Sequence, residues 1–459
     1  MAVYVVQRME LMPSVVSIFC GCGGLDLGFK EAGFDLLYAC DNDPASVDCY
    51  ARNVDGRVYQ RDVTTEAFHS DIESLGRCDV VLGGFPCQGF SKAGPKQEDD
   101  LRNTLYVEMT RVVAKLQPEI FIAENVDGIS QNFNGSFLNR IVADFQEIGY
   151  EIDHCILDAL AYGVPQHRRR IFFVGVKKGG RQTFPWPKPS HQAKARNGEF
   201  RLVEPLQQRG LFGDFSKPPQ RLRSSRTVRD AIGDLVRISP DVPDHQISKV
   251  WPKKYEQVFR AIRPGQKLCN VRHADTSVYT WQVPDAFGEV TQREIAVLET
   301  ISKHRRHKQY GSIPNGNPLP PEEIERLSGL AVIGPEIESL LDKGYLKDMG
   351  QRYDLKGAMF CSGLFKRPKW DEPSPTVLTN FNNPRYFLHP EENRPFSLRE
   401  CARLQTFPDD FVITGPKSSV GLVDGYRLVG NAVPPLMSQH LASSVLEYLR
   451  PQWTQQVAL

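Results

Sequence analysis

The sequence predicts an α/β fold, in which a mainly parallel sheet with helices on both faces is joined to a smaller second lobe. Three observations predict this fold class. Short apolar runs alternate with amphipathic helical stretches as far as about residue 178. Residues 15–19 form a β-rich run that leads into a glycine-rich turn and then into helix-spaced apolar residues. After Gly179 the sequence becomes irregular, which marks a boundary.

The elements of the first part follow one another in a regular order. Apolar runs predict strands at residues 15–19, 36–39, 58–59, 80–82, 119–123 and 171–176. Helical spacing predicts helices at residues 25–32, 103–116 and 137–148. Open α/β sheets bind ligands at the carboxyl ends of their strands, so the site is expected at that edge.

Composition and charge describe an ordinary globular chain of 459 residues, with 41% apolar and 24% charged residues. The net charge of +1 means that any nucleic-acid surface must be a local patch. The ten cysteines form no CxxC framework, which predicts free thiols, a reducing compartment and no metal site. Because neither a membrane-length apolar stretch nor a signal peptide is found, we expect a cytoplasmic protein without a membrane partner.

A thiol is presented at the end of the fourth predicted strand. Residues 83–91 read Gly-Gly-Phe-Pro-Cys-Gln-Gly-Phe-Ser, so Cys87 is expected on a loop at the sheet edge. Most free cysteines are small buried hydrophobes, and Cys87 alone would fit that description. A nucleophilic thiol needs a nearby base, acid or cation, and two later stretches offer one. These are Glu124, which ends an apolar run, and the basic residues 167–170.

The glycine turn at residues 20–24 departs from the dinucleotide pattern GxGxxG and carries no phosphate-binding basic residue. It therefore suits a ligand without phosphates, such as S-adenosylmethionine. Asp41 ends the second predicted strand, where an acid commonly binds a ribose, and Asp62 ends the third. Each acid can equally be a helix cap or a solvated turn residue.

The second half is less regular. Residues 181–226 are either a solvated linker or a basic arm that touches phosphates. Residues 291–356 contain three helical patterns and a short hairpin, which is the arrangement of a winged helix, and an ordinary helical insertion fits as well. The basic residues 303–308 could bind phosphates beside it. Helices are expected at residues 399–407 and 436–449, the latter after a turn at 430–435.

Taken together and in the same order, these stretches resemble the DNA cytosine-5 methyltransferase family over nearly the whole chain. Pro86-Cys87-Gln88 is similar to the nucleophile motif and Glu124-Asn125-Val126 to the acid motif of that family. Six stretches carry the resemblance: residues 19–24, 86–88, 124–126, 166–170, 399–408 and 430–433.

The resemblance implies a catalytic lobe with the Rossmann-like fold of S-adenosylmethionine-dependent methyltransferases, at residues 1–180 plus 425–459. It implies a target-recognition domain at 181–424, with 291–356 as the possible winged-helix-like segment. The implied reaction is methyl transfer to C5 of a flipped cytosine in a specific duplex DNA sequence. Residues 88–102 would close behind the flipped base.

The resemblance also assigns site residues. Cys87 would add to C6 of cytosine, Glu124 would act on N3, and Arg168 and Arg170 would engage O2 and the neighbouring backbone. The implied DNA contacts are Gln88, Ser91 and Arg102. The implied S-adenosylmethionine contacts are Phe19, Gly21, Gly23, Gly24, Leu25, Asp41, Asn42, Asp62, Val63, Pro86, Asn431 and Val433.

Two alternatives remain beside this reading, namely a tRNA cytosine-5 methyltransferase and a non-catalytic DNA-binding relative. A long variable region favours duplex DNA over tRNA, and the presence of both Cys87 and Glu124 disfavours a pure binder. A Rossmann dehydrogenase fits less well because the glycine spacing is wrong. We expect a stand-alone bacterial modification enzyme, a monomer, that is paired in function with a restriction endonuclease.

Overall fold

The computed structural model describes residues 12–86, 105–130, 136–179, 184–194, 200–202, 222–235, 237–247, 251–313, 316–356 and 363–456. The chain divides into two compact units. Unit 1 comprises Met1–Gln246, Asp371–Thr379 and Leu398–Leu459, and unit 2 comprises Ile247–Trp370 and Asn380–Ser397. Unit 1 thus reaches beyond the predicted boundaries at residues 180 and 425, because the segments up to Gln246 and from Leu398 onwards pack with it.

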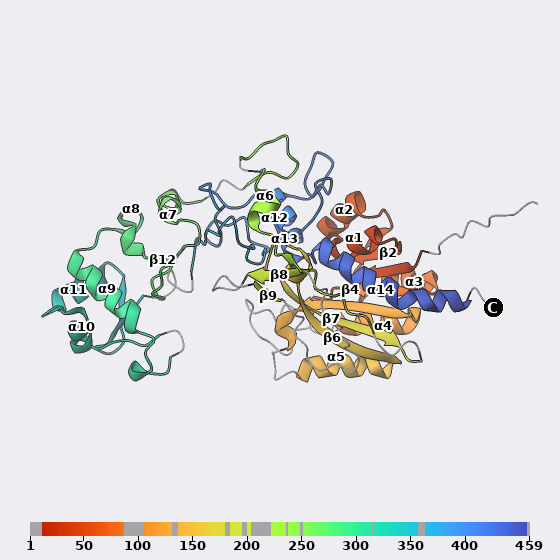
Figure 1. The fold of residues 1–459 in the computed structure, drawn as a ribbon, viewed down its shortest axis with the longest axis horizontal. Coiled ribbons are helices and arrows are strands. Elements are labelled where there is room, and N and C mark those ends of the chain that lie inside the picture. Colours follow the sequence, from red (N-terminus) through yellow and green to blue (C-terminus); the bar gives the residue numbers. More distant parts are fainter. Residues whose placement is uncertain are drawn as a thin grey trace, which may run out of the picture. The chain divides into compact units, whose positions relative to one another are not determined.

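Unit 1 is built on a seven-stranded sheet with the strand order β3-β2-β1-β4-β5-β7-β6 (Figure 1). The neighbours from β3 to β5 pair in parallel, whereas β7 is antiparallel to both β5 and β6. The predicted mainly parallel sheet is therefore confirmed. The strands are β1 (Ser14–Ile18), β2 (Asp35–Asp41), β3 (Val58–Gln60), β4 (Val80–Gly83), β5 (Ile120–Val126), β6 (Tyr150–Asp158) and β7 (Arg169–Lys177).

Helices cover both faces of this sheet (Figure 1). Val16 and Ile18 of β1 point into an apolar core formed with α3, α4 and α5, while Ser17 points to the other face, towards α1. Both faces are therefore buried, which explains why the strands read as continuous apolar runs. The helices of unit 1 are α1 (Gly24–Glu31), α2 (Pro44–Asn53), α3 (Glu66–Leu75), α4 (Leu105–Leu116), α5 (Ser136–Glu147), α6 (Val228–Ile232), α12 (Leu398–Leu404), α13 (Leu422–Asn431) and α14 (Pro435–Gln456).

The irregular region expected after Gly179 contains a small second sheet. β8 (His191–Lys194) pairs antiparallel with β9 (Phe200–Leu202) and parallel with β10 (Arg223–Ser224). The polar and proline-rich composition of this region concealed these short strands, because it lacks the apolar alternation by which strands are recognised.

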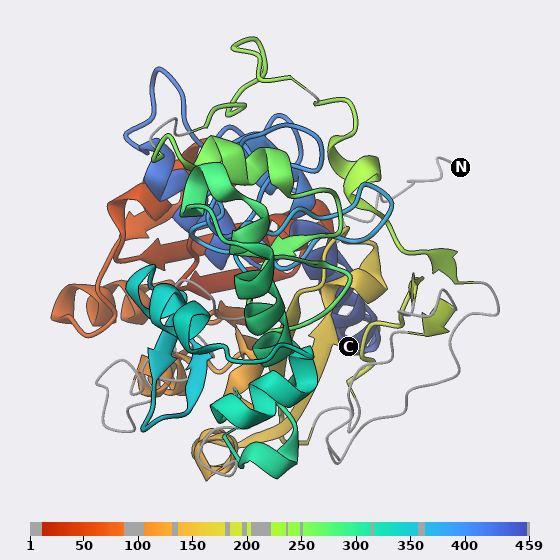
Figure 2. The same ribbon diagram turned by 90° about the vertical axis from the view of Figure 1, so that its left-hand side faces the viewer.

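Unit 2 contains two apolar clusters of its own. The three helices and the hairpin expected in residues 291–356 are present and share one of these cores, and Figure 2 draws the antiparallel hairpin as two cyan arrows. The elements of unit 2 are α7 (Tyr255–Ala261), β11 (Lys267–Leu268), β12 (Ser277–Val278), α8 (Pro284–Phe287), α9 (Gln292–His304), α10 (Pro321–Ser328), α11 (Gly334–Asp342), β13 (Leu346–Asp348) and β14 (Tyr353–Leu355).

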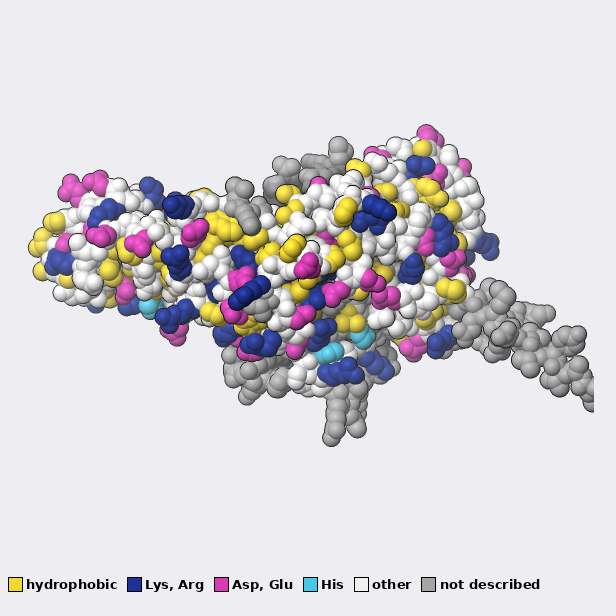
Figure 3. Space-filling view, turned by 90° about the horizontal axis from the view of Figure 1, so that it is seen from above, with side chains coloured by type: hydrophobic (Ala, Val, Ile, Leu, Met, Phe, Trp, Pro, Cys, Tyr) yellow, Lys and Arg dark blue, Asp and Glu magenta, His cyan; other side chains and the backbone are white. Residues whose placement is uncertain are grey.

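Charged side chains of both signs are interspersed on the face shown in Figure 3, in keeping with the net charge of +1. The eight cysteines among the described residues are free thiols, and all of them are buried. No helix in the described part of the chain is long and apolar enough to cross a membrane.

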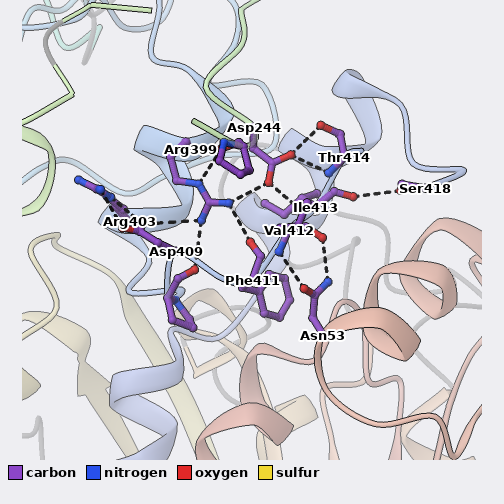
Figure 4. Close-up of polar contacts among 12 residues, drawn as sticks. Asn53, Asp244, Arg399, Arg403, Asp409, Phe411, Val412, Ile413, Thr414 and Ser418 are labelled. Carbon is purple, nitrogen blue, oxygen red and sulfur yellow. Dashed lines mark hydrogen bonds and ion pairs between the residues drawn. The ribbon is translucent and has the colours of Figure 1, made fainter. Parts of the chain in front are cut away.

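The segment of unit 1 that follows unit 2 is held by a buried polar cluster that lies beside α2 (Figure 4). Arg399 and Asp244 form an ion pair of 3.0 Å between Nη2 and Oδ2, and both side chains are fully buried. Asp244 Oδ1 also accepts hydrogen bonds from the backbone N–H and the hydroxyl of Thr414, both at 2.6 Å. Beside this cluster, Asn53 of α2 exchanges two hydrogen bonds with the backbone of Val412, at 2.9 and 2.8 Å. The segment that precedes unit 2 and the segment that follows it are thereby joined to the same part of unit 1.

The last helix, α14, packs against α1 at very short range. A Cβ atom added to Gly28 would lie 2.5 Å from the backbone nitrogen of Gln439 and 2.7 Å from the carbonyl oxygen of Pro435. Only a residue without a side chain permits this approach. The predicted association of the final helix with the N-terminal sheet therefore has a structural basis.

We expect Gly28→Ala to lower the free energy of unfolding by about 1–3 kcal/mol, because the new methyl group would meet backbone atoms that cannot move independently. In an exposed helix the same change would stabilise by about 1 kcal/mol. Urea denaturation measures the difference. Gly56→Ala is the control, since a Cβ there meets nothing within 4 Å and should change stability by less than about 0.5 kcal/mol. A stabilised Gly28→Ala protein would contradict the packing.

Asp26 on α1 is fully buried and accepts a hydrogen bond of 2.9 Å from the hydroxyl of Ser17. Burial raises the pKa of Asp26 to about 6 from an ordinary value of 3.8, although the nearby hydroxyls of Tyr50 and Ser17 oppose the shift. Because the pKa is higher in the folded state, the folded protein binds the proton more tightly than the unfolded chain does. The contribution of Asp26 to stability is therefore greatest below about pH 4 and is lost as the pH rises to about 6.

We expect Asp26→Asn to remove this loss, because the amide cannot ionise and still offers Ser17 an acceptor. Relative to the wild type, the variant should gain about 3 kcal/mol between pH 4 and pH 7, as follows from about 1.4 kcal/mol per pKa unit. Urea denaturation of both proteins across that range provides the measurement. Parallel stability curves would show that Asp26 is already charged in the folded protein at pH 4.

Candidate active site

Two neighbouring strands, β1 and β4, end level with each other at the carboxyl edge of the sheet, beside β5. The register pairs Ile18 of β1 with Gly83 of β4, and Gly83 with Ala123 of β5. The next residues, Phe19, Gly84 and Glu124, therefore lie side by side, although Glu124 is still within β5. The strand order reverses between β1 and β4, which is the position where open α/β sheets bind ligands.

Gly84 leaves room for a close approach at this edge. A Cβ atom at Gly84 would lie 3.5 Å from Oε2 of Glu124 and 3.8 Å from the carbonyl oxygen of Phe19. The turn after β1 and the Glu124 carboxylate of β5 are thus separated by little more than one glycine backbone. Sequence analysis placed both residues at the edge, and the structure brings them together.

The base of the predicted nucleophile loop is held by Asn125. Its side-chain amide donates a buried hydrogen bond of 3.0 Å to the carbonyl oxygen of Phe85. Phe85 is itself buried, and Pro86 follows it. Cys87 lies outside the described residues, as do Gln88, Ser91 and Arg102. A side chain of β5, the strand that carries Glu124, therefore fixes the backbone at Phe85, two residues before the predicted nucleophile Cys87.

Glu124 and Arg170 form an ion pair of 2.8 Å between Oε1 and Nε, with little solvent exposure of either side chain. Glu124 pairs with Phe172 across the two strands, which puts Arg170 on the same face at the diagonal position. Burial raises the pKa of Glu124, although the charges of Arg170 and Arg168 act in the opposite direction. A carboxyl group in this setting can hold a proton and donate it to a ring nitrogen.

Arg168 was predicted to act on the base together with Arg170, and the structure places its guanidinium elsewhere. The side chain is 1% exposed and donates hydrogen bonds to the carbonyl oxygens of Val377 at 3.1 Å, Gly430 at 2.9 Å and Asn431 at 3.2 Å. Burial lowers the pKa of Arg168, and the neighbouring charge of Arg170 lowers it further. In this structure Arg168 joins segments that lie more than two hundred residues further along the chain.

Two glutamines that were not predicted as site residues, Gln166 and Gln405, bind the same chain segments as Arg168. Gln166 is fully buried, donates to the carbonyl oxygen of Leu404 at 2.9 Å and accepts from the backbone N–H of Val377 at 3.0 Å. Gln166 also donates to Gln405, whose own amide donates to the carbonyl oxygen of Val429 at 2.6 Å. A neutral polar residue has no periodic signature, so only its place in the quoted motifs could have indicated these residues.

The glycine turn and Asp41 form a second part of the site. Gly21 and Gly23 have φ values of +56° and +90°, which favour glycine. Asp41 ends β2, and its carboxylate accepts hydrogen bonds of 2.9 Å from the backbone N–H groups of Gly21 and Asp43. Burial raises the pKa of Asp41, although these hydrogen bonds act in the opposite direction. The structure thus brings the turn and the acid of the second strand together.

The start of α1 also meets the turn that precedes α14. A Cβ atom at Gly24 would lie 2.3 Å from the carbonyl oxygen of Val433, and the hydroxyl of Ser438 donates to the carbonyl oxygen of Leu25. Val433 is buried and Asn431 is exposed. Four of the predicted cofactor residues therefore lie where the N-terminal and C-terminal parts of unit 1 join.

The remaining predicted cofactor residues lie around β2 and β3. Asp62 is exposed, and its Oδ1 accepts hydrogen bonds from the backbone N–H and the hydroxyl of Thr64, at 2.9 and 2.8 Å. Val63 is buried in the core below, and Asn42 is exposed. Within the described residues, no group of three or more His, Cys, Asp or Glu side chains could hold a metal ion.

Comparison with known proteins agrees with the family resemblance of the motifs. A family model described as C-5 cytosine-specific DNA methylase matches residues 14–447. The Type II methyltransferase M.AgeI of Thalassovita gelatinovora is 31% identical, over 94% of this chain and 98% of its own. The Type II methyltransferase M.BsuRI of Bacillus subtilis is 34% identical, over 67% of this chain and 76% of its own.

A solved structure shows the same fold. It is that of a prophage-encoded E. coli protein described as a DNA modification methyltransferase, with a TM-score of 0.51 and 23% identity over 95% of this chain and 99% of that protein. With the near full-length match to the family model, these likenesses confirm the resemblance read from the motifs. The chain therefore belongs to the C-5 cytosine-specific DNA methylase family and is a DNA cytosine-5 methyltransferase of the Type II restriction-modification kind.

Proposed function

We propose that this enzyme methylates C5 of a cytosine flipped out of a specific duplex DNA sequence, through a covalent bond between Cys87 and C6. We further propose that methylation protects the host DNA from a cognate restriction endonuclease. The observation that carries the proposal is the row formed by Phe19, Gly84 and Glu124 at the sheet edge, with Arg170 paired to Glu124. This row brings the turn that follows β1 and the proposed acid, Glu124, close to Gly84, which lies three residues before Cys87.

Members of this family use S-adenosylmethionine as methyl donor. The residues at the β1 and β2 ends fit that molecule. Phe19 has a left-handed φ of +55°, a strained conformation of a kind that clusters at ligand sites, and Gly21 and Gly23 leave the turn free of side chains. A carboxylate has about four acceptor positions, so Asp41 can accept ribose hydroxyls besides its two backbone donors.

We assign the cofactor contacts residue by residue. Phe19 would pack on the adenine, Asp41 and Asn42 would hold the ribose, and Asp62 and Val63 would hold the far edge of the adenine. The methionine end would lie against Gly21, Gly23, Gly24 and Leu25, and the site would be closed by Pro86, Asn431 and Val433. When bound, the cofactor supplies an electrophilic methyl group on a sulfonium sulfur.

Cys87 would convert the base into a nucleophile. Its thiolate adds to C6, the electron pair of the C5–C6 bond is delocalised towards N3, and Glu124 donates a proton to N3. C5 would then be enamine-like and would take the methyl group as the methyl–sulfonium bond breaks, which leaves S-adenosylhomocysteine, and N3 would return its proton to Glu124. A base, which we take to be water, removes the C5 proton, and the electron pair of that bond reforms C5–C6 as the C6–S bond breaks and releases the thiolate.

Two features of Glu124 support its role as the acid. Burial raises its pKa, which favours the protonated form, and Arg170 beside it can donate to O2 of the same base. Arg168 receives a different role, because its guanidinium is already committed to three backbone carbonyls. We assign Arg168 as a positioning residue that holds the turn at Gly430 and Asn431.

From the family resemblance we retain Gln88, Ser91 and Arg102 as DNA contacts and a monomer as the active form. The tRNA enzyme and the non-catalytic relative, which the family match disfavours, predict different outcomes of one experiment. A covalent trap separates all three.

We expect a denaturation-resistant adduct when the protein is incubated with S-adenosylmethionine and duplex DNA in which 5-fluorocytosine replaces cytosine. Fluorine at C5 cannot leave as a proton, so the intermediate bonded to Cys87 should persist. Denaturing gel electrophoresis detects it. Cys87→Ser is the control and should form none. An adduct with structured RNA alone would favour the tRNA enzyme, and tight DNA binding without any adduct would favour the non-catalytic relative.

We expect Arg168→Lys to raise the KM for S-adenosylmethionine about tenfold while the KM for DNA stays within about twofold. Lys lacks the planar fork whose two nitrogens reach carbonyls on separate segments, and the loss of one charged hydrogen bond weakens the turn at Gly430 and Asn431 by about 1.5 kcal/mol. Steady-state kinetics with each substrate varied in turn measures both constants. Arg170→Lys serves as the matched comparison and should chiefly lower kcat. A rise in the KM for DNA alone would contradict this role and would indicate that Arg168 contacts the flipped cytosine.

A further inference from the structure

Four cationic side chains gather in unit 2, namely Lys267, Arg272, Arg306 and Lys366, and we call them the cationic surface. Lys267 and Lys366 lie on two paired segments, since Leu268 of β11 exchanges backbone hydrogen bonds with Leu364, both at 2.9 Å. Arg272 lies in the connection between β11 and β12, where the hydroxyl of Ser277 donates to its carbonyl oxygen at 2.7 Å. Local backbone pairing thus fixes the positions of three of the four residues.

The fourth residue is brought in by a buried ion pair. Arg305, at the end of α9, donates to both carboxylate oxygens of Asp354 at 2.7 Å, and its Nη1 contacts the carbonyl oxygen of Val271 at 3.4 Å. This contact holds the end of α9 against the residue that precedes Arg272. Arg306, the next residue after Arg305, is exposed beside it.

The four cations lack anionic partners in the described part of the chain, where none of them forms an ion pair. The Lys366 ammonium lies 5.3 Å from the ring centroid of Phe387. Burial lowers the pKa of Lys366, and the charges of Lys267 and Arg272 lower it further. Burial also lowers the pKa of Arg306, again with a contribution from Arg272. The side chains therefore repel one another and would be stabilised by an anion among them.

The charges on the other helices of residues 291–356 have the opposite sign. In a winged helix the third helix would enter the DNA groove, and here that helix is α11. It contains no Lys or Arg, and it exposes Glu338 and Asp342. Lys343, at its end, is bound to Glu294 at 2.7 and 2.9 Å. Such a helix would be repelled by the phosphates that line a groove.

We propose that the cationic surface binds phosphates of the duplex DNA substrate, and that α11 does not contact the DNA. This inference rests on the proposed function, of which it specifies the DNA-binding surface. Lys and Arg that neutralise phosphates release counterions, so their contribution is independent of sequence and depends strongly on salt. The helices α9, α10 and α11 then serve to position Arg306 in the cationic surface. Residues 291–356 do not bind DNA in the manner of a winged helix.

The test compares DNA binding by full-length variants across a range of salt concentrations. Arg272→Ala/Arg306→Ala removes two exposed charges and should weaken duplex binding at least tenfold, with about 1.8 units lost from the slope of log K against log salt. Arg293→Ala/Arg326→Ala removes two exposed arginines from the same segment, which are paired with Glu336 and Glu323, and should leave both quantities unchanged. Fluorescence anisotropy with a labelled duplex that the wild type methylates gives the measurement.

A third variant tests α11. Glu338→Gln/Asp342→Asn should bind DNA as the wild type does, and tighter binding would overturn the assignment because it would place phosphates beside that helix. An unchanged salt slope in Arg272→Ala/Arg306→Ala would overturn the cationic surface while the wild type still methylates DNA, which leaves the proposed function intact. If the wild type methylates no duplex, the proposed function fails, and the salt slopes of the same variants on any labelled duplex still decide the surface, because phosphate binding is independent of sequence.

Discussion

The buried junction of Gln166, Arg168 and Gln405 is the interaction on which the rest of unit 1 depends. These side chains provide hydrogen-bond partners for backbone groups at Val377, Leu404, Val429 and Gly430. Buried backbone groups need such partners, because leaving one unsatisfied costs about 1–3 kcal/mol. The strand that carries Arg170 is therefore linked by a few polar side chains to chain segments that follow a long insertion.

The same buried junction determines the surroundings of the charged groups at the sheet edge. Glu124 and Arg168 are both buried, yet they occupy different settings. The Arg168 guanidinium faces backbone carbonyls, whereas Glu124 faces the space beside Gly84 and has Arg170 as its partner. Two neighbouring members of one site can thus serve different purposes, one in holding backbone and the other in proton transfer.

The sequence predicted most of the sheet and that the site lies at the carboxyl edge of its strands. Apolar runs gave β1, β2, β4 and β5, because strands of a parallel sheet are buried on both faces. The same reasoning placed Glu124 and Asp41 at strand ends. β6 and the antiparallel direction of β7 were not predicted, since a run of apolar residues contains no information about strand direction. The burial of Arg168 and its contacts with backbone carbonyls were not predicted, because a basic residue in a motif gives no sign of whether water or backbone surrounds it.

The contact between α1 and α14 has a consequence for the life of the protein in the cell. The backbone of Gly28 needs a partner that is synthesised more than four hundred residues later. During translation the face of α1 around Gly28 stays uncovered until α14 has left the ribosome, even though all strands of the sheet have already been synthesised. Folding of unit 1 is therefore completed only after α14 has been synthesised, and a polypeptide terminated before α14 exposes that face to chaperones and proteases.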